Sequence, residues 1–375
     1  MRGLKKKRAM RYLDITVLEA AKARLREARA RYDHLWVAFS GGKDSLTMLE
    51  LLAEVNAEDG ITTPINVMFH DEEVINTSIV RFVEKVAQDP RFNFKWLSIP
   101  MNVGFMCMGK YERFVCWDSA RAWHRQPPSF AIRDVGVNTS DMDEWEIDRA
   151  IFRVLEPKGS IGLLLGIRTQ ESLKRFITLT AKEKDNWISE GTLHGRPFAK
   201  VYPIYDWLED DVFKFFWEKG ITYCPVYDGQ MWADVNLRVS SSLHAQSWYQ
   251  LKRMKETEPE YYAQLASVIP ALETHLRYGK SLDHWQRIEG YAHTWEGIRE
   301  WARDHLDPEH VEMVTAYVRI AERMRARRER LAPLGGVAVR RVFWNVLTGA
   351  YWGTPLSHDD GVTIQDVEFE NVAAS

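Results

Sequence analysis

A glycine-rich loop at residues 40–45 constrains the fold of this chain more than any other feature. It reads Ser-Gly-Gly-Lys-Asp-Ser and follows an apolar run at residues 35–39, whose aromatic and aliphatic side chains predict a buried strand. Apolar residues at 45–52 predict a helix directly after the loop. Glycines let the backbone approach an anion closely, and the free N–H groups at a helix N-terminus attract one. The order of strand, loop and helix therefore predicts a binding site for a pyrophosphate or sulfate group.

The polar residues of the loop fit the same interpretation. Lys43 supplies a positive charge, and Ser40 and Ser45 supply hydroxyl donors. The spacing differs from that of a Walker A loop and from that of a dinucleotide-binding Gly-x-Gly-x-x-Gly loop. The alternative is a simple Gly-Gly turn before a helix with unrelated polar neighbours. The predicted nucleotide-binding residues of the loop are Ser40, Gly41, Gly42, Lys43, Asp44 and Ser45.

Strands and helices alternate over the first 220 residues. Further strands are predicted at 64–69, 94–99, 162–166 and 201–204, and helices at 14–31 (with Asp14 as N-cap), 74–86, 170–184 and 209–219. This alternation predicts an α/β fold with a Rossmann-like parallel sheet. Ligands of such sheets bind at the carboxyl ends of the strands, where the glycine-rich loop lies.

The remaining segments divide the chain into three parts. Residues 1–34 form a basic segment and a helix, residues 35–228 a nucleotide-binding α/β domain, and residues 229–375 a helical C-terminal domain. Residues 100–160 interrupt the α/β rhythm with Met, Trp, Arg and Pro, which predicts a partly looped insertion over the edge of the site.

Charged residues follow two other predicted strands. Arg168 comes after the strand at 162–166, Arg175 lies two helical turns further on, and Glu171 is close enough to orient either guanidinium. Arginine forks bind phosphate and sulfate oxygens well, so we expect both arginines to contact the anion. The alternative is a surface ion pair between Glu171 and Arg175.

The second predicted strand ends at His70-Asp71-Glu72-Glu73. Carboxylates beside a triphosphate can hold Mg²⁺, so Asp44 and Asp71 are candidate ligands. Acidic residues are also favoured at a helix N-terminus for electrostatic reasons alone. Both interpretations of Asp71 stay open.

Three motifs within residues 35–228 resemble the PP-loop adenine-nucleotide alpha-hydrolase superfamily, in its phosphoadenosine phosphosulfate (PAPS) reductase-like branch. The first is Ser-Gly-Gly-Lys-Asp-Ser, and the second is Gly-x-Arg-x-x-Glu-Ser-x-x-Arg at 166–175. The third is Pro-Ile-x-x-Trp-x-x-x-Asp-Val at 203–212, where we expect Asp206 to cap a helix and Trp207 to pack. The resemblance implies that ATP or PAPS is the ligand and that the position of Asp71 meets ribose or adenine.

The cysteines depart from the pattern of the redox members of that family. Cys107, Cys116 and Cys224 are scattered, and no cysteine follows Cys224. The C-terminal Glu-Cys-Gly nucleophile of PAPS reductases and the cysteine pairs of iron–sulfur relatives are therefore missing. We expect no iron–sulfur cluster and no disulfide framework, and we expect the three thiols to be buried and inert.

Composition indicates a protein of the cytoplasm. The net charge is −3, although basic residues crowd the N-terminus and a late helix (residues 323–330), where nucleic acid could bind. The basic start is not followed by the apolar segment of a signal peptide, and no run of 18 apolar residues exists. We therefore expect no contact with a membrane.

These observations favour an ATP pyrophosphatase-type enzyme, in which Lys43, Arg168 and Asp44 act on the phosphates with Mg²⁺. The layout also resembles the Ibr-type PAPS reductase-like proteins of bacteria and prophages, which have a helical C-terminal extension and are often encoded beside a ParB/sulfiredoxin-like partner. A nucleotide-sensing regulator that acts with such a partner or with DNA is the second hypothesis. PAPS reduction with an external thiol is the third.

Overall fold

The structure is a computed structural model that describes residues 14–108, 110–156, 158–171, 179, 187–232, 237, 251–278, 284–329, 338–352 and 370. The chain divides into two compact units. The first comprises residues Met1–Met101 and Cys116–Ser241, and the second comprises Asn102–Val115 and Ser242–Ser375. Every residue of the predicted nucleotide site belongs to the first unit.

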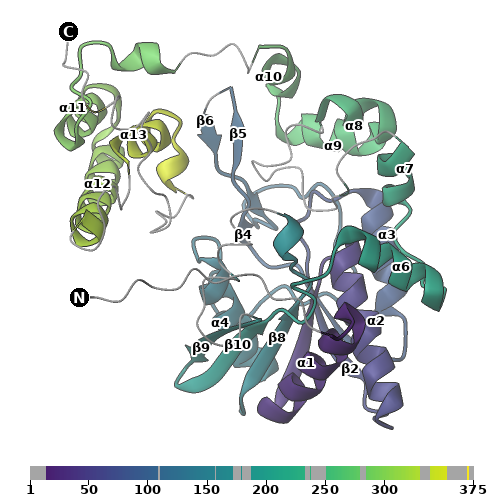
Figure 1. The fold of residues 1–375 in the computed structure, drawn as a ribbon. Coiled ribbons are helices and arrows are strands. Elements are labelled where there is room, and N and C mark those ends of the chain that lie inside the picture. The colour runs from purple at the N-terminus through teal and green to yellow at the C-terminus, as the bar shows by residue number, and fades with distance from the viewer. Residues whose placement is uncertain are drawn as a thin grey trace, which may run out of the picture. The chain divides into compact units, whose positions relative to one another are not determined.

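A six-stranded sheet forms the centre of the first unit, in the order β3, β2, β1, β8, β10, β9 (Figure 1). All neighbouring strands are parallel except β9, which is antiparallel to β10. The predicted α/β class is confirmed, and the sheet predicted to be parallel is parallel except for β9. The strands are β1 (His34–Phe39), β2 (Ile65–His70), β3 (Phe92–Leu97), β8 (Ile161–Leu165), β9 (Ile188–Leu193) and β10 (Arg196–Val201).

The strand order reverses direction at β1. From β1 the chain continues to β2 and β3 on one side of the sheet, and it later returns to β8 on the other side. In open α/β sheets, ligands bind at the carboxyl ends of the two strands where the order reverses. Here those strands are β1 and β8, so the loops after Phe39 and after Leu165 lie at the expected position for a ligand.

The predicted fifth strand at 201–204 was wrong in its bounds. Strand β10 ends at Val201, and β9 before it was not predicted. Two residues with positive φ, His194 (47°) and Gly195 (80°), connect β9 to β10, as in a tight hairpin turn. Strand β9 was not predicted because it is an edge strand with polar residues and lacks the apolar run of a buried strand.

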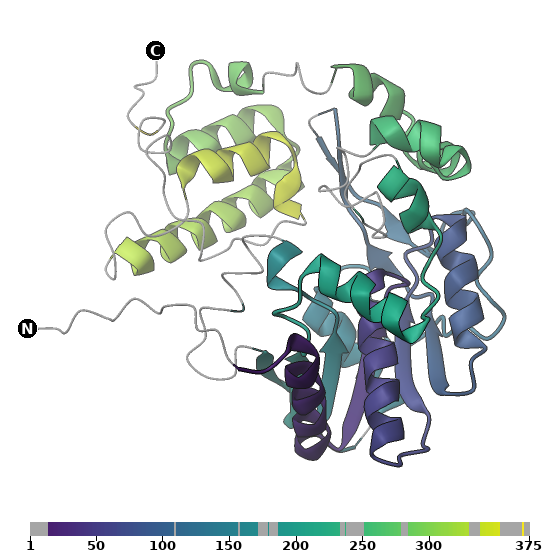
Figure 2. The same ribbon diagram turned by 45° about the vertical axis from the view of Figure 1, so that its right-hand side comes forward.

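Helices cover both faces of this sheet. The larger apolar core joins one face to α1 (Val17–Arg31), α2 (Lys43–Glu58), α3 (Thr77–Ala87) and α6 (Glu209–Lys219). A smaller core joins the other face to α4 (Glu144–Leu155), with Trp36 against Phe152. Figure 2 shows α1, α2 and α6 in front of the sheet. The helix α2 is buried along most of its length, which holds the glycine-rich loop at its N-terminus in a fixed position.

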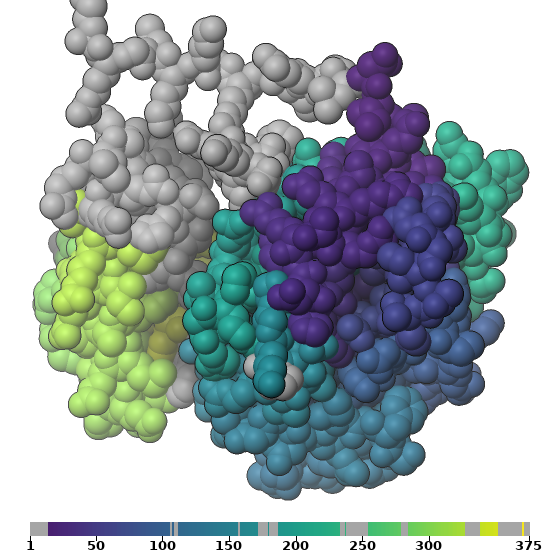
Figure 3. Space-filling view, turned by 90° about the horizontal axis from the view of Figure 1, so that it is seen from below, coloured from purple at the N-terminus to yellow at the C-terminus, as the bar shows by residue number. Residues whose placement is uncertain are grey.

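Two helices begin later than predicted because other residues cap them. Helix α1 begins after Thr16 rather than Asp14: the Thr16 hydroxyl accepts from the Glu19 N–H, and the Glu19 carboxylate accepts from the Thr16 N–H. Helix α3 begins at Thr77 because the Asn76 side chain accepts from the Ser78 N–H. In the space-filling view of Figure 3, α1 (purple) lies against the surface of α2 (blue-violet).

The predicted capping role of Asp206 was also wrong. Its carboxylate instead forms a two-pronged ion pair with Arg24, with N–O distances of 2.8 and 2.7 Å. Asp211 caps α6 by accepting from the Leu208 N–H. Trp207 is buried in the core, which confirms that it packs.

The segment at 100–160 is more regular than predicted, since it contains α4 and four short strands. Two of them, β5 (Phe105–Cys107) and β6 (Lys110–Glu112), pair as an antiparallel hairpin that belongs to the second unit. The other two are β4 (Met101–Asn102) and β7 (Val115–Cys116).

Beyond residue 250, the described part of the chain is helical, as predicted. Trp301, Val314, Val318 and Phe343 lie at the centre of the core of this unit. Its described helices are α8 (Leu251–Thr257), α9 (Pro259–Val268), α10 (Leu272–Tyr278), η4 (Trp285–Ile288), α11 (Trp295–His305), α12 (Pro308–Glu329), α13 (Val339–Leu347) and η5 (Ala350–Trp352). None of the helices within the described ranges is long and apolar enough to cross a membrane.

Candidate functional site

The glycine-rich loop lies between the end of β1 at Phe39 and the start of α2 at Lys43. The hydroxyls of Ser40 and Ser45 lie 3.0 Å apart, and the Ser45 hydroxyl accepts from the Ser40 N–H at 3.1 Å. Gly42 is the N-cap of α2 and has no side chain to cap the first N–H groups of the helix. The loop therefore holds both hydroxyls close together beside a helix N-terminus.

Gly41 allows this loop to lie against α3. Its φ is +75°, in the left-handed region that favours glycine. A Cβ atom at this position would lie 2.8 Å from the Ile79 Cγ2 atom and 2.9 Å from the Val83 Cγ2 atom. Gly41 is thus required both by its backbone conformation and by the lack of room for a side chain.

Lys43 is buried, with 4% of its surface exposed. Its ammonium lies 3.1 Å from the Asp44 carboxylate and 3.1 Å from the Glu209 carboxylate, and it donates to the Leu237 carbonyl at 3.2 Å. The backbone N–H of Lys43, at the start of α2, donates to the Tyr227 hydroxyl at 2.8 Å. Internal partners therefore occupy both nitrogens of Lys43.

Arg168 brings a second buried cation to the same place. It follows β8, is 2% exposed, and donates from Nε to the Asp44 carboxylate at 2.6 Å. Gln170 accepts from its Nη1 atom at 2.8 Å, and Glu171 accepts from its backbone N–H at 2.9 Å. Glu171 thus orients Arg168 through the backbone. Arg175 lies outside the described residues.

The two loops touch because of Gly166. A Cβ atom on Gly166 would lie 2.4 Å from the carbonyl carbon and oxygen of Asp44. Only a glycine lets the end of β8 pass so close to the backbone of α2. This contact places Arg168 beside the glycine-rich loop.

Sequence reasoning missed two members of this cluster. Glu209, the first residue of α6, lies between the two cations, 3.1 Å from Lys43 and 3.7 Å from Arg168. Tyr227 reaches the loop from α7 (Val226–Trp232). Glu209 lies within the third motif and Tyr227 near the end of the predicted α/β domain, but nothing in the spacing indicates which side chain points at the loop.

Asp71 lies at the carboxyl end of β2 and is completely buried. One carboxylate oxygen accepts from Arg125 and the Glu73 N–H, and the other accepts from the Trp96 indole N–H and the Ser98 hydroxyl. Burial raises the pKa of Asp71, although these donors act in the opposite direction. Four donors match the four lone pairs of a carboxylate, so in this conformation Asp71 has no lone pair left for a metal ion or a ribose.

Glu73 forms a second buried anchor beside Asp71. Its φ is +62°, and its carboxylate accepts from both terminal nitrogens of Arg121 and from the N–H groups of Trp117 and His124. Burial alone would raise the pKa of Glu73, but these hydrogen bonds together hold it below its usual value. Asp71 and Glu73 thus fasten residues 117–125 to the end of β2.

Asp44 fits a magnesium ion better than Asp71 does. Its carboxylate has two internal partners, Arg168 and Lys43, and it lies at the loop where phosphates would bind. Mg²⁺ commonly uses one or two carboxylates together with phosphate oxygens and water. Within the described ranges, no group of three or more His, Cys, Asp or Glu residues is arranged to hold a metal ion.

The three cysteines are buried free thiols, as predicted. Burial raises the pKa of Cys107 and raises that of Cys116 well above its usual value. A buried thiol with a raised pKa is a poor nucleophile.

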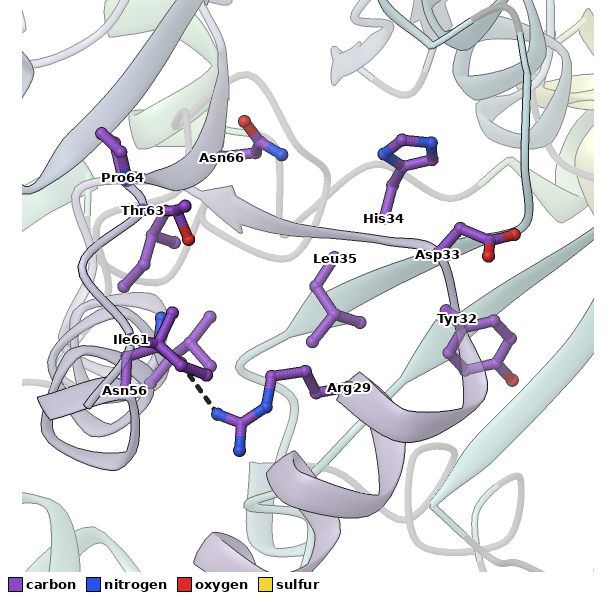
Figure 4. A pocket seen from close by; sticks show the side chains of 12 residues that line it. Arg29, Tyr32, Asp33, His34, Leu35, Asn56, Ile61, Thr63, Pro64 and Asn66 are labelled. Atoms are coloured by element: carbon purple, nitrogen blue, oxygen red, sulfur yellow. Dashed lines mark hydrogen bonds between the residues drawn. The ribbon is translucent and has the colours of Figure 1, made fainter. Parts of the chain in front are cut away.

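A cavity of about 200 Å³ lies beside the first residues of β1 and β2 (Figure 4). Arg29, His34, Asn56 and Asn66 contribute polar groups to its lining, and Arg29 donates to Asn56 at 3.0 Å. His34 begins β1, so this cavity lies at the amino ends of the strands, away from the glycine-rich loop.

Comparison with known proteins identifies relatives that match part of the chain. The chain is 28% identical over 236 residues to the uncharacterized protein YbdN of Escherichia coli (strain K12), and this match covers 60% of the chain but only 58% of YbdN. Two solved structures with low similarity are an FMN adenylyltransferase of Candida glabrata in complex with FMN and an ATP analogue, and a PAPS reductase of Candida auris in a phosphate complex. The FMN adenylyltransferase is 13% identical with a TM-score of 0.37, and the match covers 56% of this chain and 58% of the adenylyltransferase chain. The PAPS reductase is 15% identical with a TM-score of 0.32, and the match covers 56% of this chain and 84% of the reductase chain.

The family itself is shown by the sequence. The model of the phosphoadenosine phosphosulfate reductase domain matches residues 34–115 and 146–273, which is more than half of the chain. The matched residues include the glycine-rich loop, Arg168, Glu209 and Tyr227. The chain therefore belongs to the phosphoadenosine phosphosulfate reductase domain family.

Proposed function

We propose that this protein binds an adenine nucleotide with its phosphates on residues 40–45 and acts as an ATP pyrophosphatase-type enzyme. The observation that carries the proposal is the convergence of two buried cations, Lys43 and Arg168, on the loop between β1 and α2. Cations and N–H groups held in place before the ligand arrives stabilise the charge that develops when the bond between the α- and β-phosphates breaks. Adenylation or another activation of an acceptor is the proposed outcome.

Each residue of the site has a distinct part in this proposal. A nucleophile of the acceptor attacks the α-phosphorus, and pyrophosphate leaves with its charge facing Lys43, Arg168 and the first N–H groups of α2. Ser40 and Ser45 donate to phosphate oxygens, while Glu171 keeps Arg168 in position. Bound Mg²⁺ would neutralise phosphate charge, with Asp44 as its carboxylate ligand. Asp71 supports the site indirectly, by holding residues 117–125.

A nucleotide-binding regulator without turnover is the second candidate. One observation favours it: Asp44 and Glu209 already pair with the Lys43 ammonium, and Tyr227 already accepts from the Lys43 N–H. These are the groups that would contact phosphate. Such a protein could act with a ParB-like partner or with DNA. PAPS reduction is a further alternative and would need an external thiol, since the three cysteines are buried.

Binding and pyrophosphate release with ATP and Mg²⁺ test the proposal. In Lys43→Ala we expect ATP affinity to fall at least tenfold and release to be lost, because a charge-assisted phosphate contact contributes about 1.5–3 kcal/mol. Lys214→Ala is the matched control, since its side chain is 69% exposed on α6. Binding without release in the wild-type protein would favour the regulator, and equal affinity of Lys43→Ala and wild type would contradict the phosphate site itself.

A further inference from the structure

The Lys43 N–H is the first donor of helix α2 and has no acceptor within the helix. The N-cap residue Gly42 offers it no side-chain acceptor, and the first hydrogen bond within the helix is the one from the Leu46 N–H to the Gly42 carbonyl. Donors at this position contact the oxygens of bound anions in phosphate-binding loops. In this protein the Tyr227 hydroxyl accepts from the Lys43 N–H at 2.8 Å.

Tyr227 is held in this position by its ring. The side chain is 2% exposed, and its ring lies against the rings of Phe213 and Tyr223, with centroid distances of 6.4 and 6.3 Å. The Lys43 ammonium lies 5.6 Å from the centroid of the Tyr227 ring. Burial raises the pKa of Tyr227 well above its usual value, so the group at the loop is a neutral phenol.

We propose that Tyr227 is an internal competitor of the nucleotide phosphates: its hydroxyl and a phosphate oxygen use the same Lys43 N–H, so the ligand binds only after Tyr227 has withdrawn. This inference rests on the proposed function and adds a residue that limits affinity. A charge-assisted hydrogen bond is about twice as strong as a neutral one, so phosphate can displace the phenol. At the far end of α7 the Trp232 side chain is 94% exposed, so its packing does not oppose this movement.

The test is calorimetric titration of ATP and of inorganic pyrophosphate, each with Mg²⁺, into Tyr227→Phe and wild type. The substitution keeps the ring and removes the competing oxygen, so we expect both ligands to bind about two- to tenfold more tightly, the range that corresponds to one neutral hydrogen bond. Tyr223→Phe is the matched control. It removes a phenol from the same aromatic cluster, but that phenol donates to Asp228 at 2.9 Å and not to the loop, so we expect wild-type affinity.

Hydrogen–deuterium exchange of the wild-type protein gives a second measurement that does not depend on how the variant folds. Saturating ATP should speed exchange in residues 226–232, because the displaced Tyr227 loosens α7, while α1 (residues 17–31) should stay unchanged. Equal or weaker binding by a folded Tyr227→Phe, or unaltered exchange at 226–232 with ATP bound, would overturn the role of Tyr227 alone. If wild type and Tyr227→Phe both fail to bind ATP and pyrophosphate, the proposed function is wrong and this inference with it.

Discussion

The Arg168 guanidinium donates to the Asp44 carboxylate at 2.6 Å, although the two residues lie 124 positions apart in the chain. This ion pair joins the loop after β8 to the first turn of α2, at the point where the strand order reverses. Lys43 and Glu209 extend the pair into a cluster of two cations and two carboxylates. In the proposed function, a phosphate group that enters the site takes the place of these carboxylates beside Lys43 and Arg168.

Replacing Arg168 by Lys tests whether ATP binding needs the planar guanidinium group of the arginine. The positive charge stays, but the bidentate geometry is lost, so we expect ATP affinity to fall about tenfold with the fold retained. Arg149→Lys, an exposed position on α4, is the control and should bind ATP as wild type does. Titration of both variants decides the matter. Unchanged affinity in Arg168→Lys would show that only charge, and not geometry, is recognised.

Replacing Gly166 by Ala should move the two loops apart. The added methyl group would lie 2.4 Å from the Asp44 backbone, which cannot move aside as a flexible side chain could. We expect a loss of about 1–3 kcal/mol in the free energy of unfolding, together with weaker ATP binding. Gly229→Ala meets no atom within 4 Å in α7 and should be neutral or slightly stabilising. Thermal unfolding and ATP titration measure both effects, and a fully stable Gly166→Ala would argue against this close contact.

Replacing Glu73 by Gln should change how stability depends on pH. The pKa of Glu73 is lower in the folded protein than its ordinary value of 4.5, so its ionised form stabilises the fold above about pH 4.5, and this contribution disappears as the pH falls through the folded pKa. We expect Glu73→Gln to lose about 2 kcal/mol at pH 7 and progressively less towards acid pH.

The measurement for Glu73 is denaturant unfolding between pH 3 and pH 7. Glu27→Gln, an exposed position on α1, is the control and should follow the wild-type curve. Parallel pH curves for Glu73→Gln and wild type would mean that the Arg121 pair does not stabilise the ionised form.

Replacing Cys107, Cys116 and Cys224 together by Ala should leave ATP binding and pyrophosphate release unchanged. All three thiols are buried, and the ion pairs described above for Lys43 and Arg168 are all with carboxylates. The folded wild-type protein should also resist a thiol reagent that labels the unfolded chain completely. A triple variant that binds ATP but loses turnover would instead point to a thiol in the reaction.

Local patterns in the sequence were enough to predict strands β1, β2, β3 and β8, the loop and the two cations. The run before Ser40 and the glycine pair after it encode a strand, a turn and a helix start within a dozen residues, and Arg168 stands at the end of another apolar strand. Helix starts were less certain, because Asp14 and Thr16 are both good N-caps. Only Thr16 has a glutamate three residues later to complete a capping box.

The tertiary structure alone decided which side chains complete the site and which do not. Asp71 stands at the end of a strand as a ligand residue would, yet Arg125, Trp96 and Ser98 take up its carboxylate. Glu209 and Tyr227 lie in the first turns of two ordinary helices, yet they reach Lys43. Periodicity specifies the face of a helix or strand on which a residue lies, whereas its partner in another element depends on how elements far apart in the chain pack together.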